Sequence, residues 1–305
     1  MRRPKTPETE TKPTIKELLK MTLEGAEIID LKNDNEAFTS KDFFEIKITD
    51  KEKWQSPEEM EKLVDLFGDL IKKLYGSREN PPTYDKNDPV TRQEVLKIIS
   101  NPEGEIGCAD SIIVAADQDK IISFIASEKL ELEGQENLGY LALAATTPEE
   151  RNKGYGTELL KKSLEQNKFD AVLGISHTPA MIEIWQNAAR ETGYTNFFCG
   201  HKDGIFGDRG TPQEQKEVAR LHESFVQLCR EEEVLIEGEM PPGYIVVDVE
   251  IGPIPPLQAA EVKFPQDSPL KETFEKGLLP TQAGRLPHTV YGIFLSIKEG
   301  DKESN

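Results

Sequence analysis

The sequence predicts an α/β (α+β) fold with a mixed central sheet and helices on both faces. Two observations carry this prediction. Apolar runs with the alternation of strands dominate the first half, and strand then alternates with helix. The composition, 36% hydrophobic and 30% charged, also provides enough apolar surface for a sizeable core. The predicted element order is β-α-α-β-β-β-α-β-α-β, ending in one or two closing strands.

The first predicted elements lie before residue 101. Residues 43–48 alternate apolar and polar side chains, as a half-buried strand does. Ser56 precedes a proline and two glutamates, a typical helix start, and an apolar stripe of helical spacing follows to Leu74. Residues 91–100 predict a shorter helix. We expect residues 1–42 to form a partly disordered extension, with no firm assignment inside it.

Strands and then alternating elements complete the predicted core, which we assign to residues 43–200. Residues 112–116 and 121–125 flank a polar turn and predict a hairpin, and a third strand follows over 138–145. A helix over 156–167 and a buried strand over 171–175 come next. Pro179 then opens a helix that stops at Gly193.

The last third, residues 201–305, is predicted to be an extension of helix, strand, helix and strand that packs on the core or completes it. Our preferred interpretation takes the closing strands of the sheet from residues 195–199, 244–251 and 289–298, separated by long insertions. The alternative is a small separate module.

The charge balance narrows the class of partner. The chain carries 37 basic and 56 acidic residues, a net charge of −19. Such a field repels phosphate backbones, so we expect no nucleic-acid partner, and it favours a cationic ligand. A simpler reading is that the acids only make the surface soluble. Three scattered cysteines and no apolar stretch of membrane-spanning length predict a cytoplasmic protein without membrane contact.

A junction between a predicted strand and a predicted helix carries the chemistry. After Pro-Glu-Glu, an RxxGxG pattern starts at Arg151 and places glycines at Gly154 and Gly156. The first turn of a helix offers backbone N–H groups and the positive end of its dipole, which bind pyrophosphate oxygens. Glycines keep side chains away from those amides. The Walker pattern is absent, and Leu159 stands where a dinucleotide fingerprint needs its third glycine.

This junction resembles that of the GNAT superfamily of acyl-CoA-dependent N-acyltransferases, whose motif there is [QR]xxGx[GA]. The resemblance covers roughly residues 43–194 and implies the GNAT fold, with acetyl-CoA (CoA) as co-substrate. It further implies direct transfer of the acetyl group to a primary amine, on a small molecule or a peptide, and the acidic charge balance favours a cationic one. The residues implied to bind the cofactor are Ala145, Thr146, Thr147, Arg151, Asn152, Lys153, Gly154, Tyr155, Gly156 and Thr157.

The resemblance also implies a bulged strand around Ala145 that separates from the strand over residues 171–176. The thioester would lie in the slot between them, with a backbone N–H of the bulged strand as oxyanion donor. Thr146 departs from the apolar residue that the family places there.

The usual catalytic side chains of the family are missing. The position of its tyrosine acid is occupied by Ala189, and that of its glutamate base by Tyr140. We consider two substitutes. His177 follows the strand beside the slot, where an imidazole accepts a proton readily, or it caps the next helix. Tyr140 either protonates the thiolate or binds the amine, or is a half-buried strand aromatic. No histidine has a partner at metal-ligand spacing, so we expect no metal.

Three functions remain open at this level. The first is an N-acetyltransferase that acts on an amine. The second is a catalytically inactive, CoA-binding regulatory protein, which the missing tyrosine and glutamate favour. The third is a structural protein in which the loop is a coincidence.

Overall fold

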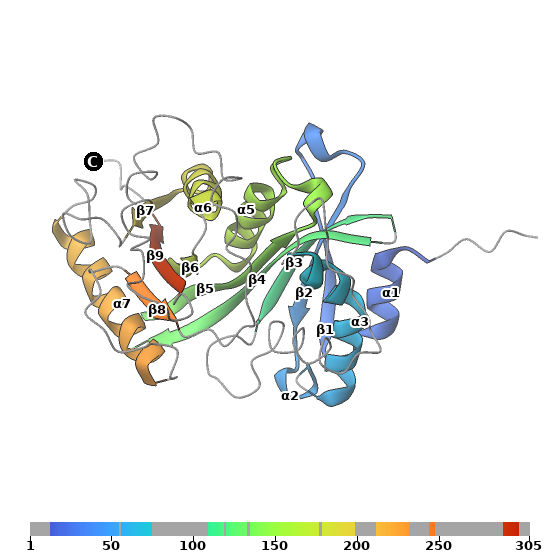
Figure 1. Ribbon diagram of the computed structural model, residues 1–305, viewed down its shortest axis with the longest axis horizontal. Helices are drawn as coiled ribbons and strands as arrows, with labels where there is room; N and C mark the ends of the chain where they lie inside the picture. The colour runs from blue at the N-terminus through green and yellow to red at the C-terminus, as the bar shows by residue number, and fades with distance from the viewer. Residues whose placement is uncertain are drawn as a thin grey trace, which may run out of the picture.

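The computed structural model describes residues 13–54, 56–74, 109–118, 120–132, 135–176, 179–198, 212–231, 244–247 and 289–298. Within these residues the strands form one nine-stranded sheet, with helices on both of its faces (Figure 1). The elements are α1 (Ile15–Thr22), β1 (Ala26–Leu31), η1 (Glu36–Phe38), β2 (Asp42–Ile48), α2 (Lys51–Trp54), α3 (Pro57–Leu74), β3 (Ser111–Asp117), β4 (Lys120–Leu132), β5 (Gln135–Thr146), η2 (Pro148–Glu150), α5 (Tyr155–Asn167), β6 (Ala171–Ser176), α6 (Pro179–Glu191), β7 (Tyr194–Phe198), α7 (Pro212–Glu231), β8 (Tyr244–Val247) and β9 (Thr289–Lys298).

The sheet is mixed, which confirms the predicted fold class. Its strand order is β1-β2-β3-β4-β5-β6-β9-β7, and β8 pairs with β9. The β5–β6 pair is parallel, and the other pairs among these described strands are antiparallel. The hairpin predicted around residues 117–120 is β3–β4. The sheet also begins earlier than the sequence suggested, since α1 and β1 precede residue 43. The helix predicted over residues 91–100 lies outside the described residues.

The end of the chain supplies an inner strand of this sheet. β9 lies between β6 and β7, antiparallel to both, so a strand from residues 289–298 separates two strands that are close in sequence. β8 also pairs with β9, antiparallel, along residues 289–292. This pairing agrees with the interpretation that residues 195–199, 244–251 and 289–298 supply the closing strands. The division at residues 42 and 200 stays a prediction.

The described residues pack into one buried cluster on each face of the sheet. α1 and α3 contribute to the first cluster with Leu19, Leu63 and Phe67, against Phe44 and Phe124 of the strands. α5 and α6 contribute to the second cluster, on the opposite face. Because successive side chains of a strand point to opposite faces, the face of any strand residue can be read from its neighbours in these two clusters.

One glycine of β5 is required by packing in the second cluster. A Cβ on Gly139 would lie 2.3 Å from Cδ2 of Phe169. Phe169 is buried, and its carbonyl accepts a 2.6 Å hydrogen bond from the hydroxyl of Tyr194. Burial raises the pKa of Tyr194 to about 12. The ring of Phe169 therefore lies directly on the backbone of β5, close to where β5 and β6 pair.

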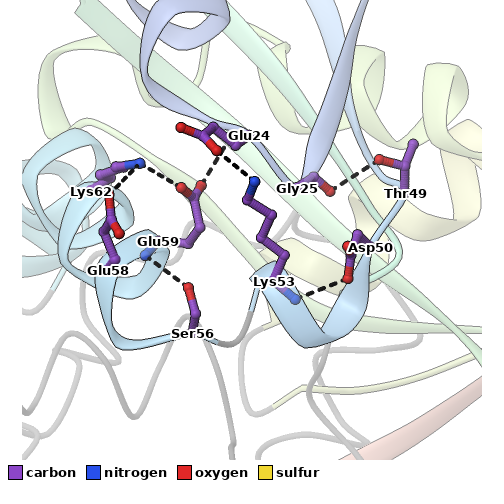
Figure 2. Close-up of polar contacts among 9 residues, drawn as sticks. All are labelled: Glu24, Gly25, Thr49, Asp50, Lys53, Ser56, Glu58, Glu59 and Lys62. Carbon is purple, nitrogen blue, oxygen red and sulfur yellow. Dashed lines mark hydrogen bonds and ion pairs between the residues drawn. The ribbon is translucent and has the colours of Figure 1, made fainter.

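Polar contacts attach α2 and α3 to the first hairpin of the sheet (Figure 2). Ser56 caps α3 as predicted, since its Oγ accepts a 3.3 Å hydrogen bond from the N–H of Glu59. The buried carboxylate of Glu59 accepts from the N–H of Glu24 at 3.2 Å and pairs with Nζ of Lys62 at 2.6 Å. Lys53 of α2 pairs with Glu24 as well. These contacts fix the helical face of the first cluster to the strands.

Candidate cofactor site at the β5–α5 junction

Pairing between β5 and β6 ends before either strand does. The parallel register runs from Leu138 opposite Ala171 to Leu141 opposite Gly174 and stops there. β5 continues to Thr146, and β6 continues to Ser176 while still paired with β9 on its other side. The two strands therefore separate, as the resemblance implied.

A bulge in β5 lies where the strands separate. On β4, Ala126 faces Leu143 and the adjacent Ser127 faces Leu141, so Ala142 is an extra residue in β5. Such a bulge bends its strand and increases the local twist, which turns β5 away from β6. Ala144 is exposed although it lies in an inner strand of a nine-stranded sheet. Solvent therefore reaches β5 beyond the bulge.

The ladder on the other side of β5 shows which amides face the separated edge. The N–H of Thr147 donates to the carbonyl of Ile122 at 2.9 Å. Since hydrogen-bonded and non-bonded pairs alternate in an antiparallel ladder, Ala145 bonds to β4, whereas Ala144 and Thr146 direct their backbone groups away from it. The Oγ of Ser123 on β4 donates to the carbonyl of Ala145 at 2.9 Å, in agreement. The amides directed at the β6 side therefore belong to Ala144 and Thr146, the neighbours of Ala145.

A short turn then leads into an uncapped helix. Thr147 precedes η2, Asn152 has a φ of 64°, and Gly154 has a φ of 90° at the N-cap of α5. The N–H of Glu158 donates to the carbonyl of Gly154 at 3.1 Å, and Gly154 offers no side chain to cap the helix. The amides of the first turn, over residues 155–157, have no intrahelical acceptor. They lie beside the separated end of β5.

The two glycines of the motif have different physical roles. Gly154 has a left-handed conformation that costs other residues roughly 1–2 kcal/mol, and a Cβ there would meet only Cζ of Phe38 at 3.5 Å. Gly156 instead permits close helix packing, because its Cβ would lie 2.8 Å from Cδ1 of Ile184 on α6. Backbone conformation thus requires the first glycine, whereas the second lies at the contact between α5 and α6, where a Cβ would displace the end of the Ile184 side chain.

We expect Gly154→Ala to destabilise the fold by about 1–2 kcal/mol and to weaken acetyl-CoA binding, because it strains the turn that presents the amides. Gly193→Ala is a matched control, since Gly193 has a φ of 79° and a Cβ added to it would meet no atom within 4 Å. Urea unfolding and calorimetric titration with acetyl-CoA measure both effects. Equal loss of affinity in the two variants would contradict the role given to Gly154.

The side chains of the turn form a partly charged rim. Nε of Arg151 donates to the carbonyl of Thr146 at 3.3 Å, and Nζ of Lys153, half exposed, pairs with Oε1 of Glu150 at 3.0 Å. Tyr155 is buried, with its ring 4.6 Å from that of Phe38. Burial raises the pKa of Tyr155 to about 12, and the carboxylate of Glu150 adds to the shift. Tyr155 therefore keeps its proton at neutral pH.

The two candidate catalytic residues have different outcomes. His177 lies outside the described residues. Tyr140 is 5% exposed and lies on β5 directly before the separation, with its ring 5.6 Å from that of Phe225 of α7. Ala189, at the family's tyrosine position, is fully buried. Sequence reasoning missed Glu128, which faces Tyr140 from β4 and is 3% exposed. The strand predicted from the sequence ended at residue 125. Had the alternation of inward and outward side chains been extended to residue 128, it would have placed this carboxylate on a buried face of the sheet.

Neither a metal centre nor a membrane-spanning helix occurs in the part of the chain that the structure describes. No three His, Cys, Asp or Glu side chains there are grouped so that they could hold a metal ion. None of the described helices combines the length and the apolar character needed to span a membrane.

Comparison with known proteins finds a family match over part of the chain. Residues 72–173 match the family described as "Acetyltransferase (GNAT) family". Similar solved structures include a GNAT family acetyltransferase from Brucella melitensis in complex with acetyl-CoA (16% identity, 46% of this chain, 79% of that chain, TM-score 0.30). Another is PH1933 from Pyrococcus horikoshii OT3 (17% identity, 59% of this chain, 93% of that chain, TM-score 0.32). A third is the catalytic domain of Tetrahymena GCN5 histone acetyltransferase in complex with coenzyme A (16% identity, 62% of this chain, 81% of that chain, TM-score 0.28). No curated protein matches the sequence. The family resemblance of the chain is thus a match to the GNAT acetyltransferases over residues 72–173.

Proposed function

We propose that the protein is an N-acetyltransferase that transfers an acetyl group from acetyl-CoA to a primary amine. The observation that carries this proposal is the early end of β5–β6 pairing beside the uncapped start of α5. The backbone N–H groups at a separated strand edge can hydrogen-bond an extended ligand that carries amide groups of its own. The free N–H groups in the first turn of a helix can bind a pyrophosphate. Both features lie next to each other in one junction.

The residues of the junction divide into two groups. The amides of residues 151–157, with the cations of Arg151 and Lys153, would hold the pyrophosphate of coenzyme A. The strand around Ala145 would align the rest of the molecule, with the N–H groups of Ala144 and Thr146 as its backbone donors. Acetyl-CoA supplies the acetyl group as a reactive thioester. These residues orient it and provide a hydrogen bond where negative charge develops.

The acceptor would approach from the face of the sheet that carries Tyr140. Leu141 belongs to the cluster under α5 and α6, so the adjacent Tyr140 points to the opposite face. Phe225 of α7 contacts Tyr140 there, so α7 forms a wall of this face. We propose that the acceptor bound at this face is an amine, on a small molecule or a peptide. The net charge of −19 favours a cationic acceptor. We place the reaction in the cytoplasm.

Thiol release tests this proposal directly. Dialysed protein is mixed with acetyl-CoA and with spermidine, kanamycin or a lysine-containing peptide, and free thiol is followed by a colorimetric reagent. We expect amine-dependent release together with acetylation of the amine by mass spectrometry. Acetyl-CoA that binds in calorimetry without turnover of any amine would contradict the enzyme and support the second function below. Absence of binding would contradict both.

A CoA-binding protein without catalysis is the second candidate. The buried Ala189 on α6 favours it, because this side chain has no hydroxyl to protonate a leaving thiolate. His177 and Tyr140 remain the proposed substitutes in the enzyme. His177→Ala and Tyr140→Phe, assayed as above, show whether either residue contributes to turnover.

A further inference from the structure

The connection between β1 and β2 packs on the start of α5, although it precedes the residues that match the family. The ring of Phe38, in η1, lies 4.6 Å from that of Tyr155, and both side chains are buried. A Cβ added to Gly154 would meet Cζ of Phe38 at 3.5 Å. Phe38 therefore supports the turn and the first helical residue beside the N–H groups that we assign to the pyrophosphate.

Contacts of its own hold this connection in place. The side chain of Asn35 caps η1, and Nδ2 of Asn33 donates to the carbonyl of Phe38 at 2.6 Å. Nζ of Lys41 pairs with the carboxylate of Asp117, at the end of β3. Since hydrogen bonds fix η1 and an ion pair fixes the end of the connection to the sheet, residues 32–41 form a stable support for α5.

The same connection holds a buried carboxylate in the first turn of α5. Oε2 of Glu158 accepts a 3.1 Å hydrogen bond from Nδ2 of Asn35, and Oε1 lies 3.2 Å from Nζ of Lys162. Nζ of Lys162 also donates to the carbonyl of Lys32 at 2.5 Å. Glu158 and Lys162 are 7% and 6% exposed. Asn35 and the carbonyl of Lys32 thus complete the hydrogen bonding that a buried ion pair needs.

The direction of this carboxylate matters for an anionic ligand, because Glu158 lies in the same helical turn as the N–H groups of residues 155–157. Negative charge there stabilises the helix but repels the phosphates of a bound cofactor. Each oxygen of Glu158 has its own donor, Asn35 for one and Lys162 for the other. The carboxylate is therefore held to the side, and the first-turn N–H groups stay available to a pyrophosphate.

We propose that Asn35 is a positioning residue of the cofactor site, which acts through Glu158 to set the affinity of the first turn of α5 for the pyrophosphate of CoA. This inference rests on the proposed function. Asn35 acts through the helix and not on the acetyl group, so its loss weakens binding of CoA and leaves the chemical step unchanged. A role in stability alone would leave the CoA affinity of the folded protein unchanged.

Asn35→Asp tests this role with a side chain of the same size. The variant keeps the oxygen that caps η1 and replaces the donor to Glu158 with a second carboxylate. We expect calorimetry to show a CoA affinity about 10-fold lower than that of the wild type, and the KM for acetyl-CoA to rise by a similar factor at unchanged kcat.

A double variant restores the contact with its donor and acceptor exchanged. Asn35→Asp combined with Glu158→Gln conserves the total charge, because the carboxylate moves to position 35 and the amide to position 158. We expect the double variant to bind CoA within about threefold of the wild type, which makes the two changes strongly non-additive. An affinity as low as that of Asn35→Asp alone would overturn the role of Asn35.

Asn167→Ala is the matched control, at the other end of the same helix. Nδ2 of Asn167 donates to the carbonyl of Ser163 at 3.0 Å and to Oγ of Ser127 at 3.3 Å, and the side chain is half-buried like that of Asn35. We expect Asn167→Ala to lower the urea midpoint and to keep the CoA affinity of the wild type. An equal loss of affinity in this control, or wild-type affinity in Asn35→Asp, would contradict the positioning role.

The binding measurements separate this inference from the proposed function. If the wild type binds CoA but acetylates no amine, the proposed enzyme fails, and the affinities of the variants still decide the role of Asn35. If the wild type acetylates an amine and Asn35→Asp has the wild-type affinity and KM, the inference fails alone. If the wild type binds no CoA, both fail.

Discussion

Replacement of Ala144 by proline is expected to lower kcat for acetyl transfer about 10²–10³-fold while the protein stays folded. The reason is the direction of one N–H. The ladder uses the backbone groups of Ala145 for β4, which leaves the N–H of Ala144 directed toward the separated edge. Proline removes this donor, and a position whose N–H is not in the ladder tolerates proline better than one whose N–H is. Steady-state kinetics and calorimetry with acetyl-CoA measure the effect.

Two control variants make the Ala144→Pro result specific. Ala144→Val keeps the N–H and adds a side chain that strands accept, so it should retain most of the activity. Ala145→Pro removes an N–H that the ladder uses and should lower the unfolding free energy by about 3 kcal/mol or more. A fall in kcat at unchanged affinity assigns the Ala144 amide to the developing oxyanion, and a fall in affinity assigns it to the bound thioester chain. A folded Ala144→Pro protein with the kcat and the acetyl-CoA affinity of the wild type would contradict the role given to the Ala144 amide.

The sequence predicted the local elements that depend on periodicity and capping. Ser56 starts α3 by accepting the amide of Glu59, and the strand, turn and helix around Gly154 follow the expected order. These features depend on contacts within a few residues, so short windows of sequence contain them. The strand β1 was not predicted firmly. It lies at the edge of the sheet with mixed burial, so its alternation is weak.

The less predictable part of the site depends on residues far apart in the chain. Neither Glu128 nor Phe225 belongs to the recognised motif, and both meet Tyr140 only through strand register and through α7. The motif also could not show that Gly156 serves contact with Ile184. A one-residue bulge at Ala142 decides which side chains and amides share a face, and sequence alternation does not reveal it.

Leu295→Pro is expected to destabilise the whole fold, by about 3 kcal/mol or more, although it lies close to the end of the sequence. Leu295 pairs with Leu173 of β6 on one side and with Phe197 of β7 on the other. The N–H of Lys298 donates to the carbonyl of Asp170 at 2.9 Å, which by alternation directs the N–H of Leu295 at β7. An inner strand has no free edge at which proline is tolerated.

The Leu295→Pro variant also separates the two interpretations of residues 201–305. If β9 completes the core, the loss of its pairing releases the edge of β6 next to the cofactor site, and acetyl-CoA affinity falls together with the urea midpoint. A separate module would lose its own structure and leave affinity unchanged.

Asp30→Pro is the matched control, because Asp30 lies on the edge strand β1 with its N–H directed away from β2. Asp30→Pro should lower the free energy of unfolding only slightly, because it removes an exposed ion pair with Lys16 and adds a small backbone strain. A Leu295→Pro protein as stable as Asp30→Pro would show that β9 is not an inner strand, and the closing of the sheet around the cofactor site would then need another strand.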